Sequence, residues 1–378
     1  MTEIKSVDNR SLFRIFIDLP ESIYKGLSAF DPPLAVDRRM LLDPSQSSLW
    51  QRAKVKYWLA YRDGVPVGRI SAQADPVLPV GIAPGAGAFG CIDAIDDREV
   101  IASLVATAQS WLAGRGCGSI YGPCTLTMNE EPGLLVEGCD EPVMTLSPWH
   151  PPYLKHHLEA LGFAKLRDLL FWRLALSEVS VSHTKLSRRL AERIPDLRIR
   201  HPDRPSYDAD IQLLCDVYND GWQDHWGFVP LMPADLDGLD QLMKWLVPRQ
   251  AFKIAEVAGQ AVAVLLLVPN LFELKRGMGG RPSLIGWGRL AWRLITHRFR
   301  SGRIIVFGLR KRMQGTVAGS AIAALLVDNL IADSMALRGE WVEAGWVLED
   351  NHALIQMLKS FNFQPVKKYR IYGRTISA

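Results

Sequence analysis

The sequence of 378 residues has few cysteines, no long apolar run and no acidic residue in one long stretch. Its five cysteines are odd in number and none lies in C-x-x-C spacing, so neither a disulfide framework nor a metal site is expected. The longest apolar run, residues 261–268, is much shorter than the roughly 20 residues that span a bilayer. The amino-terminal segment also lacks the apolar core of a secretory signal. These absences predict a cytoplasmic protein that does not cross a membrane.

The stretch without Asp or Glu covers residues 274–327. It contains eleven Lys and Arg and therefore carries +11, whereas the whole chain carries +4 and the remainder −7. Positive charge confined to one segment indicates a negatively charged partner at that segment. The composition, 48% hydrophobic and 22% charged, excludes a disordered chain, and the length suits two domains.

Two halves of the sequence follow the same order of predicted elements. Two apolar strands flank Asp63-Gly64 in the first half and Ala258-Gly259 in the second, which predicts a β-hairpin in each. Each hairpin precedes a strand, a long helix, a strand, a short helix and a closing strand. The predicted ranges are 56–62, 65–72, 89–95, 97–114, 119–126 and 152–161 in the first half, and 251–257, 260–268, 303–309, 317–337, 341–348 and 351–361 in the second.

This repetition predicts a tandem duplication of an α+β unit. The expected domains cover residues 1–180 and 195–378, and the second domain carries an insert at about 270–301. Two unrelated α+β domains are the alternative.

A glycine-containing turn links the strand at 303–309 to the following helix. The segment reads IIVFGLRKRMQGTVAGSAIAALL, with Gln314, Gly315 and Gly319 in the turn and three basic residues before it. Helix amino termini present unpaired amides and a positive dipole end, which bind phosphate groups. Arg310 and Lys311 would add charge that pairs with phosphate.

The order of elements and this turn resemble the GCN5-related N-acetyltransferase (GNAT) superfamily, whose [Q/R]-x-x-G-x-[G/A] motif binds the pyrophosphate of coenzyme A. The resemblance implies a tandem pair of GNAT-like domains, each a mixed, mostly antiparallel sheet flanked by helices. It also implies acyl-CoA as co-substrate, with no covalently bound cofactor. The residues implied for acyl-CoA are Leu309, Arg310, Lys311, Gln314, Gly315, Gly319 and Ser320.

This chain departs from the GNAT pattern at several positions. Val317 replaces the middle glycine of the turn, and Leu358 stands where many GNAT enzymes have a tyrosine acid. The first half reads IDAIDDREV at the equivalent turn, where carboxylates would repel phosphate. One acyl-CoA site, in the second half, is therefore expected.

A narrower resemblance covers nearly the whole chain. The blocks FGCIDAIDDREV, IYGPCTLTMNEEPGLLVEG, GWQDHWGFVPL and WVLEDN are similar to a bacterial family of double-GNAT proteins that includes the bacterial ceramide synthases. The resemblance implies acylation of the amine of a sphingoid base. The alternatives are an N-acetyltransferase for a small soluble amine or peptide, and a non-catalytic protein that binds acyl-CoA or lipid.

The insert contains a basic amphipathic segment, SLIGWGRLAWRLITHRF. At helical spacing Arg289 and Arg293 share a face, and aromatic residues Trp287 and Trp292 accompany the apolar residues. Such a helix suits an anionic membrane surface. A helix packed on the domain with solvated arginines is the alternative, and the arginines could also bind the phosphates of coenzyme A. No nucleic-acid recognition motif accompanies them, so no nucleic-acid partner is expected.

Amine acylation needs a base for the attacking ammonium and an acid for the leaving thiolate. Glu343 lies in the middle of an apolar strand and is a candidate base, with an ion pair to arginine as the alternative. Asn351, at the end of that strand, is a candidate catalytic residue or the N-cap of the next helix. Tyr369 on the last strand is a candidate acid or a core residue.

Two further clusters are candidates for the acceptor site. In GWQDHWGFVP, His225 can exchange protons near neutral pH, and Trp222 and Trp226 suit an apolar acceptor. Aromatic packing between helices is the alternative. Asn129 and Glu130, in a loop of the first half, would bind the acceptor amine if the halves face each other, or serve the turn around Pro132-Gly133.

Overall fold

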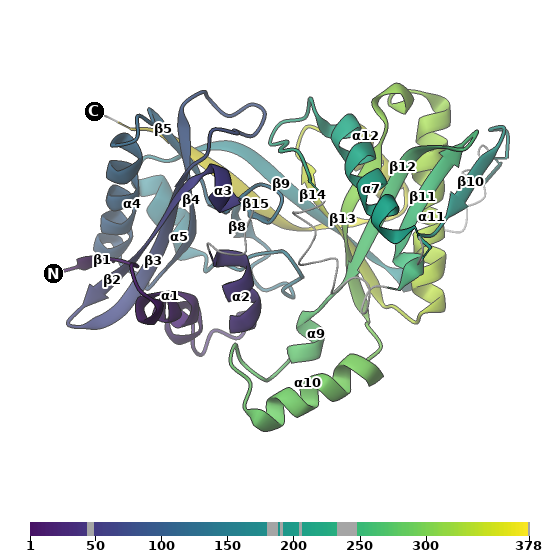
Figure 1. Cartoon of the computed structure of the whole chain (residues 1–378). Helices are drawn as coiled ribbons and strands as arrows, with labels where there is room; N and C mark the ends of the chain where they lie inside the picture. Colours follow the sequence, from purple (N-terminus) through teal and green to yellow (C-terminus); the bar gives the residue numbers. More distant parts are fainter. Residues whose placement is uncertain (44–48, 180–187, 190–191, 204–205, 233–247, 377–378) are drawn as a thin grey trace. The chain divides into compact units, whose positions relative to one another are not determined.

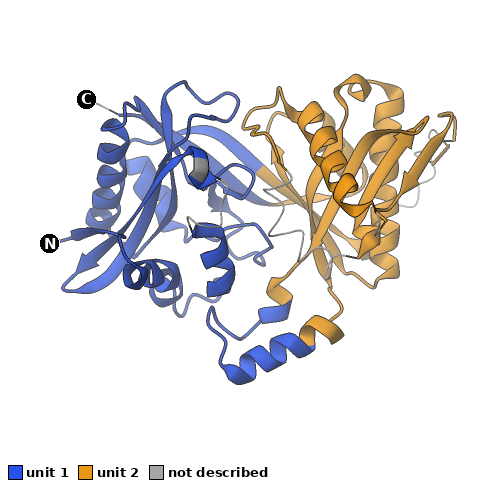
Figure 2. Cartoon of the chain, in the orientation of Figure 1, with its two compact units in different colours: residues 1–169, 274–292, 367–378 blue, residues 170–273, 293–366 orange. Residues whose placement is uncertain are grey.

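The computed structural model describes residues 1–378 apart from 44–48, 180–187, 190–191, 204–205, 233–247 and 377–378 (Figure 1). The chain forms two compact units, coloured separately in Figure 2. Unit 1 comprises Met1–Leu169, Leu274–Trp292 and Lys367–Ala378, and unit 2 comprises Leu170–Glu273 and Arg293–Val366. In each unit, helices cover both faces of a β-sheet.

The sheet of unit 1 runs in the order β1, β2, β3, β4, β5 and the carboxy-terminal part of β15. Its strands are antiparallel except for the parallel pair β4 and β5. The bounds of its strands are β1 (Glu3–Ser6), β2 (Lys54–Arg62), β3 (Val65–Ala74), β4 (Ala86–Ala94), β5 (Ser119–Gly122), β8 (Leu134–Glu137) and β15 (Gln364–Thr375). Those of its helices are α1 (Arg10–Ile23), α2 (Ala35–Leu42), α3 (Leu49–Arg52), α4 (Arg98–Ala113) and α5 (Tyr153–Ala160).

Alternation along β2 explains the two cores of unit 1. Tyr57 and Leu59 pack with α1, whereas Trp58 and Ala60 pack with α4 and α5 on the other face. The strand predicted over 119–126 is divided, because β5 ends at Gly122 and a short β6 (Cys124–Thr125) pairs with β7 (Glu131–Pro132). Pro123 lies between them and has no amide hydrogen to donate to the sheet.

The sheet of unit 2 runs in the order β9, β14, β13, β12, β11, β10. Residues of α7 pack on one face and residues of α11 and α12 on the other. Strand bounds are β9 (Ala164–Ala175), β10 (Leu197–Arg200), β11 (Phe252–Val257), β12 (Gln260–Pro269), β13 (Ser301–Leu309) and β14 (Trp341–Leu348). Helix bounds are η1 (Leu176–Glu178), α7 (Tyr207–Trp222), η2 (Arg249–Ala251), α9 (Phe272–Lys275), α10 (Leu284–Thr296), η3 (Lys311–Met313), α11 (Val317–Ala336) and α12 (His352–Ser360).

Helix α11 is, within the described ranges, the one helix that is long and apolar enough to cross a bilayer by length and composition. Half of it is buried inside the protein. Ile322, Leu326 and Leu330 belong to the main core of unit 2. Its apolar character is therefore explained by core packing.

The predicted α+β order is confirmed in both halves of the chain. Each hairpin turns through two residues with positive φ, Asp63 (50°) and Gly64 (78°) in one, and Ala258 (49°) and Gly259 (74°) in the other. Two such residues make a type I′ turn, whose twist matches the strands that it joins. In both halves the third strand then pairs in parallel with the strand that follows the long helix.

The closing strands of the two halves are exchanged between the units. Strand β9 ends the first half but lies beside β14 in unit 2, whereas β15 ends the second half and pairs with β5 in unit 1, with Tyr372 opposite Gly122. The compact units therefore differ from the consecutive ranges predicted as domains, 1–180 and 195–378. Because the two halves have the same strand pattern, the sequence does not reveal which of the two sheets each closing strand joins.

Part of the predicted insert also belongs to unit 1. Lys275 pairs with Asp31, Arg281 Nε donates to Asp18 at 2.9 Å, and the Gly280 amide donates to a carboxylate oxygen of α1 at 3.1 Å. Acidic groups of the first half therefore hold the basic insert of the second.

Candidate functional site

The turn between β13 and α11 is built around Gly319 and Thr316. Thr316 caps α11: its hydroxyl accepts from the Gly319 amide at 2.9 Å and donates to the Met313 carbonyl at 2.7 Å. A Cβ at Gly319 would lie 1.9 Å from that carbonyl oxygen. Gly315 has a φ of 71°, a conformation that favours glycine. Both glycines are therefore required for the helix to begin against the turn.

The turn presents donors and positive charge to solvent. Amides in the first turn of a helix, here those of Val317 and Ala318, have no carbonyl one turn earlier to bond. Lys311 and Arg312 are exposed shortly before this helix, with Lys311 paired to Asp224 and Arg312 Nη2 donating to Gln260 at 2.9 Å. Nothing lies within 4 Å of a Cβ placed on Gly315. The amides, the helix dipole and the cations suit an anionic group such as a phosphate.

Several side chains of the turn bond within the protein. Gln314 Nε2 donates to the Gly221 carbonyl at 2.7 Å and to the Leu309 carbonyl at 3.1 Å, which fastens the turn to the end of α7. Ser320 Oγ donates to the Thr316 carbonyl at 3.0 Å, and Arg310 Nε donates to the Ala261 carbonyl at 3.1 Å. These contacts position the turn.

Strands β13 and β14 part next to this turn. In the part of the chain that the structure describes, their parallel pairing extends from Ser301 and Trp341 to Ile304 and Ala344, although both strands continue for several residues. In the segment of β13 that is paired with β12 but not with β14, the Phe307 carbonyl accepts from Trp222 Nε1 at 2.8 Å. The two strands therefore diverge at the end of the sheet where this turn lies.

An aromatic cluster at the end of α7 flanks the parted strands. The Trp222 ring lies 4.8 Å from the His225 ring and 6.2 Å from the Trp346 ring, between centroids. His225 Nδ1 is buried and has no hydrogen-bond partner among the described residues. Trp226 follows it and is half-buried. The sequence predicted Trp222, Trp226 and His225 as site residues but not Trp346, which is an aromatic residue in a strand and gave no separate signal.

The other candidates of the second half have structural partners. Glu343 is fully buried within the paired stretch of β14, and Arg173 Nη2 lies 3.3 Å from its Oε2. Its neighbour across the strand pair is Arg303, whose guanidinium donates to the Gly345 carbonyl. The Asn351 side chain accepts from the Leu354 amide at 3.1 Å and caps α12. These contacts match the alternatives, an ion pair and an N-cap, and the catalytic roles of Glu343 and Asn351 stay predictions.

The candidates in unit 1 are also engaged. Tyr369 is buried, and its hydroxyl donates to the Pro148 carbonyl at 3.0 Å. Glu130 accepts from the Thr127 amide at 2.8 Å, and the Asn129 amide donates to the Thr127 hydroxyl at 3.1 Å. Glu130 and Asn129 thus form a turn, and their predicted acceptor role stays a prediction.

The helix of unit 1 that corresponds to α11 presents negative charge. Asp97 caps α4 by accepting from the Val100 amide at 3.1 Å, and Arg62 Nη1 donates to it at 2.7 Å. The hydrogen bond from Arg62, followed by that from the amide, lowers the pKa of Asp97 to about 2. A carboxylate thus occupies the helix terminus where a phosphate would bind, as the sequence predicted.

Unit 1 also contains a buried polar cluster that the sequence did not predict. Arg69 Nε donates to Asp93 at 2.8 Å, Arg38 pairs with Glu131, and His150 Nδ1 accepts from a backbone amide at 3.2 Å. Burial lowers the pKa of His150 to about 4, although nearby carboxylates oppose the shift. A signal was available, because Arg69 and Asp93 stand inside apolar strands, where unpaired charges are costly.

Known structures and relatives now define the class. A tandem GNAT protein from the clavulanic acid biosynthesis pathway superposes with a TM-score of 0.55 over 100% of this chain and 99% of its own, at 11% identity. The fold is therefore that of a tandem GNAT protein, as predicted. No protein-family model matches the sequence.

Two relatives match over almost the full length. Protein YghO of Escherichia coli is 32% identical over 377 residues, which is 99% of this chain and 95% of YghO. The bacterial ceramide synthase of Caulobacter vibrioides is 33% identical over 96% of this chain and 94% of its own. The chain belongs to the double-GNAT family that includes this ceramide synthase, which confirms the predicted resemblance.

Proposed function

We propose that this protein is an acyl-CoA-dependent N-acyltransferase that acylates the amine of a sphingoid base at the cytoplasmic face of a membrane. The observation that carries the proposal is the parting of β13 and β14 beside the phosphate-binding turn of α11. In the same unit an aromatic cluster with a half-buried histidine, whose Nδ1 is buried, flanks the parted strands.

Acyl-CoA is the substrate for which the turn is suited. The amides of Val317 and Ala318, with Lys311 and Arg312, would hold its pyrophosphate. Lys311 is positioned by its own amide, which donates to Asp220 at 2.8 Å, and by the pairing of its ammonium with Asp224. Gly319 and Gln314 act by keeping the turn in place.

We assign binding of the acceptor amine to the aromatic cluster of Trp222, His225 and Trp346. A sphingoid base is an ammonium ion at neutral pH and must lose a proton before it attacks the thioester. His225 Nδ1 is a buried nitrogen with a free lone pair or proton, and we assign it the role of base. Apolar faces of the two tryptophans would contact the long chain of the acceptor.

Helix α10 supports a membrane location. Its one buried residue is Leu290. Leu284, Ile285 and Ile295 are exposed by 91%, 78% and 85%, respectively, and Trp292 by 69%. Trp287 is also exposed, and Arg289 and Arg293 flank the apolar face at helical spacing. A helix packed on the domain would bury its apolar face, whereas this helix presents it to solvent, as an interfacial helix does.

The central experiment incubates the full chain with sphinganine and fatty acyl-CoA of several chain lengths in detergent. The expected result is an N-acyl product, detected by mass spectrometry, with free CoA thiol in equal amount. Absence of product at every chain length would overturn the proposal. If the protein acylated only soluble amines, with acetyl-CoA as the donor, the acceptor would be a small amine and not a sphingoid base.

Two variants test the assigned parts. His225→Gln is expected to lower kcat at least about a hundredfold, the usual contribution of a general base, without weakening acyl-CoA binding. His201→Gln, a half-buried histidine elsewhere in unit 2, is its control. The double variant Ile285→Ser and Ile295→Ser should weaken binding to vesicles by about a hundredfold or more, because each buried isoleucine contributes about 1.5–3 kcal/mol. Val65→Ser, an exposed valine outside α10, should leave vesicle binding unchanged.

A further inference from the structure

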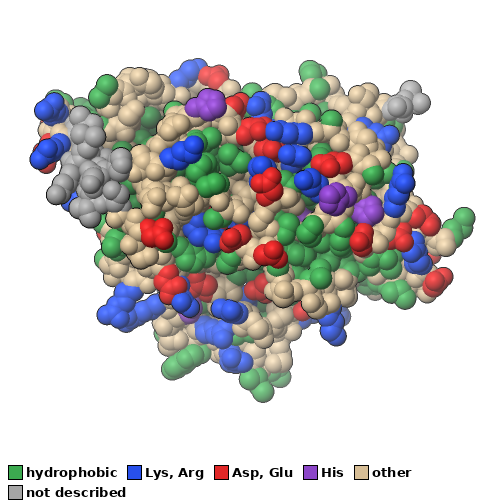
Figure 3. Space-filling model, turned by 180° about the vertical axis from the view of Figure 1, so that it is seen from behind, with side chains coloured by type: hydrophobic (Ala, Val, Ile, Leu, Met, Phe, Trp, Pro, Cys, Tyr) green, Lys and Arg blue, Asp and Glu red, His purple; other side chains and the backbone are tan. Residues whose placement is uncertain are grey.

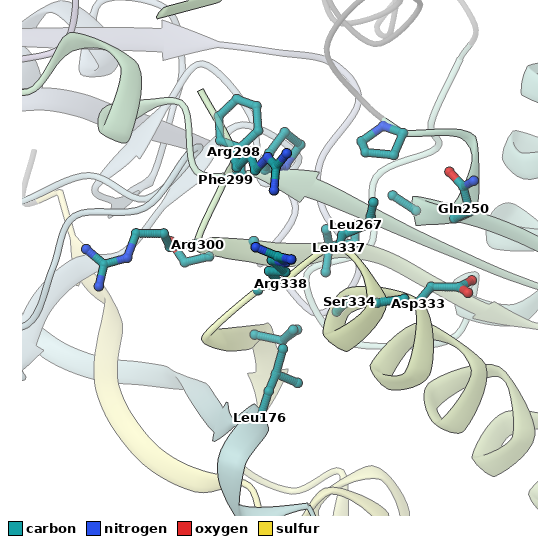
Figure 4. A pocket seen from close by; sticks show the side chains of 18 of the residues that line it. Leu176, Gln250, Leu267, Arg298, Phe299, Arg300, Asp333, Ser334, Leu337 and Arg338 are labelled. Atoms are coloured by element: carbon teal, nitrogen blue, oxygen red, sulfur yellow. The ribbon is translucent and has the colours of Figure 1, made fainter. Parts of the chain in front are cut away.

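Unit 2 has a pocket of about 410 Å³ at the end of β13 opposite the acyl-CoA turn (Figure 4). The nine residues of β13 separate the two places by about 27 Å, at roughly 3.3 Å per residue. The carboxy-terminal ends of α10 and α11 and the first residues of β13 and β14 line the pocket. It is therefore distinct from the site assigned to acyl transfer.

The pocket carries an excess of positive charge. Arg298 and Arg338 line it, and neither has an ion-pair partner among the residues that the structure describes. Arg300 also lines it but is paired with Glu340, with 2.6 Å between Nε and Oε1. The one acidic residue in the lining, Asp333, is paired with Lys253. Two cations are thus left for an anion from outside the protein.

The rest of the lining is largely apolar. Figure 4 shows Leu267 and Leu337 beside the Arg338 guanidinium, with Phe299 next to Arg298. A small hydrophilic anion would leave such a surface uncovered. Cations beside an aliphatic wall instead match an amphiphile with an anionic head.

The last turn of α10 contributes to the pocket. Leu294 lines the pocket and is 44% exposed. Ile295, the next residue of this helix in unit 2, is 85% exposed. Figure 3 shows hydrophobic and basic side chains together at the lower edge, where α10 lies in Figure 1. A molecule in this pocket would thus contact Leu294 in the last turn of α10.

We propose that this pocket binds the phosphate of an anionic phospholipid through Arg298 and Arg338, with the start of its acyl chains against Leu294 and Leu337. The site makes the membrane attachment selective for anionic lipid. It rests on the proposed membrane attachment by α10, and it assigns a lipid-binding role to a part of unit 2 that is separate from catalysis.

The test measures binding of the full chain to vesicles of phosphatidylcholine with and without phosphatidylglycerol. Arg298→Gln with Arg338→Gln should reduce the preference for phosphatidylglycerol by about thirtyfold, since each basic residue at an anionic surface contributes roughly fivefold. Arg14→Gln with Arg39→Gln removes the same charge from exposed positions of unit 1 and should change the preference little. An equal loss in both double variants would overturn the proposal.

A pocket-filling variant separates the pocket from general surface charge. Ala336→Trp keeps every charge but fills space at the exposed end of α11, and it should remove the preference for phosphatidylglycerol while binding to neutral vesicles persists. An unchanged preference would overturn the pocket assignment. Saturable binding of soluble glycerol phosphate that depends on Arg298 and Arg338 would overturn the lipid assignment and identify the ligand as a free phosphate ester.

Failure of this proposal can be told apart from failure of the proposed function. Acyl transfer to sphinganine in detergent needs no vesicle, so product formation with unselective vesicle binding overturns only the lipid site. Wild-type protein that binds neither kind of vesicle overturns the membrane attachment and this proposal together.

Discussion

Acid should destabilise unit 1 through one buried histidine, His150. Its side chain is 6% exposed, and Nδ1 accepts from the Leu135 amide at 3.2 Å. Burial lowers its pKa from 6.5 to about 4, with Arg69 acting in the same direction and Asp93 and Glu131 opposing it. The folded protein therefore keeps His150 neutral at a pH where the unfolded chain takes up a proton.

The size and sign of the effect follow from this difference in pKa. A histidine with a lowered folded pKa contributes stability that is fully present above pH 6.5 and is lost as the pH falls toward 4. Between pH 7 and pH 5 the loss is about 2 kcal/mol, and it approaches about 3 kcal/mol below pH 4. A loss of 2 kcal/mol changes the ratio of folded to unfolded protein by about thirtyfold.

The assay compares urea unfolding of wild type and His150→Gln from pH 7.5 to pH 5. Glutamine can accept a hydrogen bond from the Leu135 amide but does not titrate. The free energy of unfolding of the variant should therefore fall by about 2 kcal/mol less than that of the wild type over this pH range. The protection factor of the Leu135 amide, which is its intrinsic exchange rate at each pH divided by the observed rate, should fall with acid in the wild type only. His352→Gln, at an exposed histidine of α12, is the control and should follow the wild type. Parallel loss of stability in wild type and His150→Gln would refute the reasoning.

Three further predictions concern unit 2. Gly319→Ala places a Cβ against a carbonyl oxygen of the turn and should weaken acyl-CoA binding at least tenfold in calorimetry, whereas Gly288→Ala, with open space around its Cβ, should not. Thr316→Val removes the cap of α11 and should lower the free energy of unfolding by about 1 kcal/mol, with Thr316→Ser restoring most of it. Glu343→Gln removes the charge of a fully buried carboxylate that lies 3.3 Å from Arg173 Nη2, and it should lower the free energy of unfolding by about 3 kcal/mol in urea. A fall in kcat at unchanged stability would contradict this last prediction and favour Glu343 as the base.

Local patterns made most of the fold predictable. Strand alternation, helical periodicity and the Asp63-Gly64 signal depend on neighbours in sequence, so both hairpins and both long helices fall close to their predicted ranges. The exchange of β9 and β15 depends on pairing between distant segments of equal pattern. Nothing local distinguishes a closing strand that joins its own half from one that joins the other.

The site was predictable where backbone geometry demands a residue type. Gly319 and Gly315 met that condition, since a helix that begins against a tight turn excludes side chains there. Gln314 belongs to the motif, but only the folded chain shows its amide bonded to carbonyls of α7 and β13. The cluster around Arg38 and His150 combines residues more than 100 positions apart, so no spacing in the sequence pointed to it.

The exchanged closing strands make the two halves of the chain inseparable. A cut between β9 and β10 would give one fragment that holds the strand needed by β14 and another that holds the strand needed by β5. Each fragment alone would present an unpaired sheet edge, a template for aggregation. Together they form the intramolecular counterpart of a domain-swapped dimer. Co-expressed fragments should therefore reconstitute the protein, whereas neither should be soluble by itself.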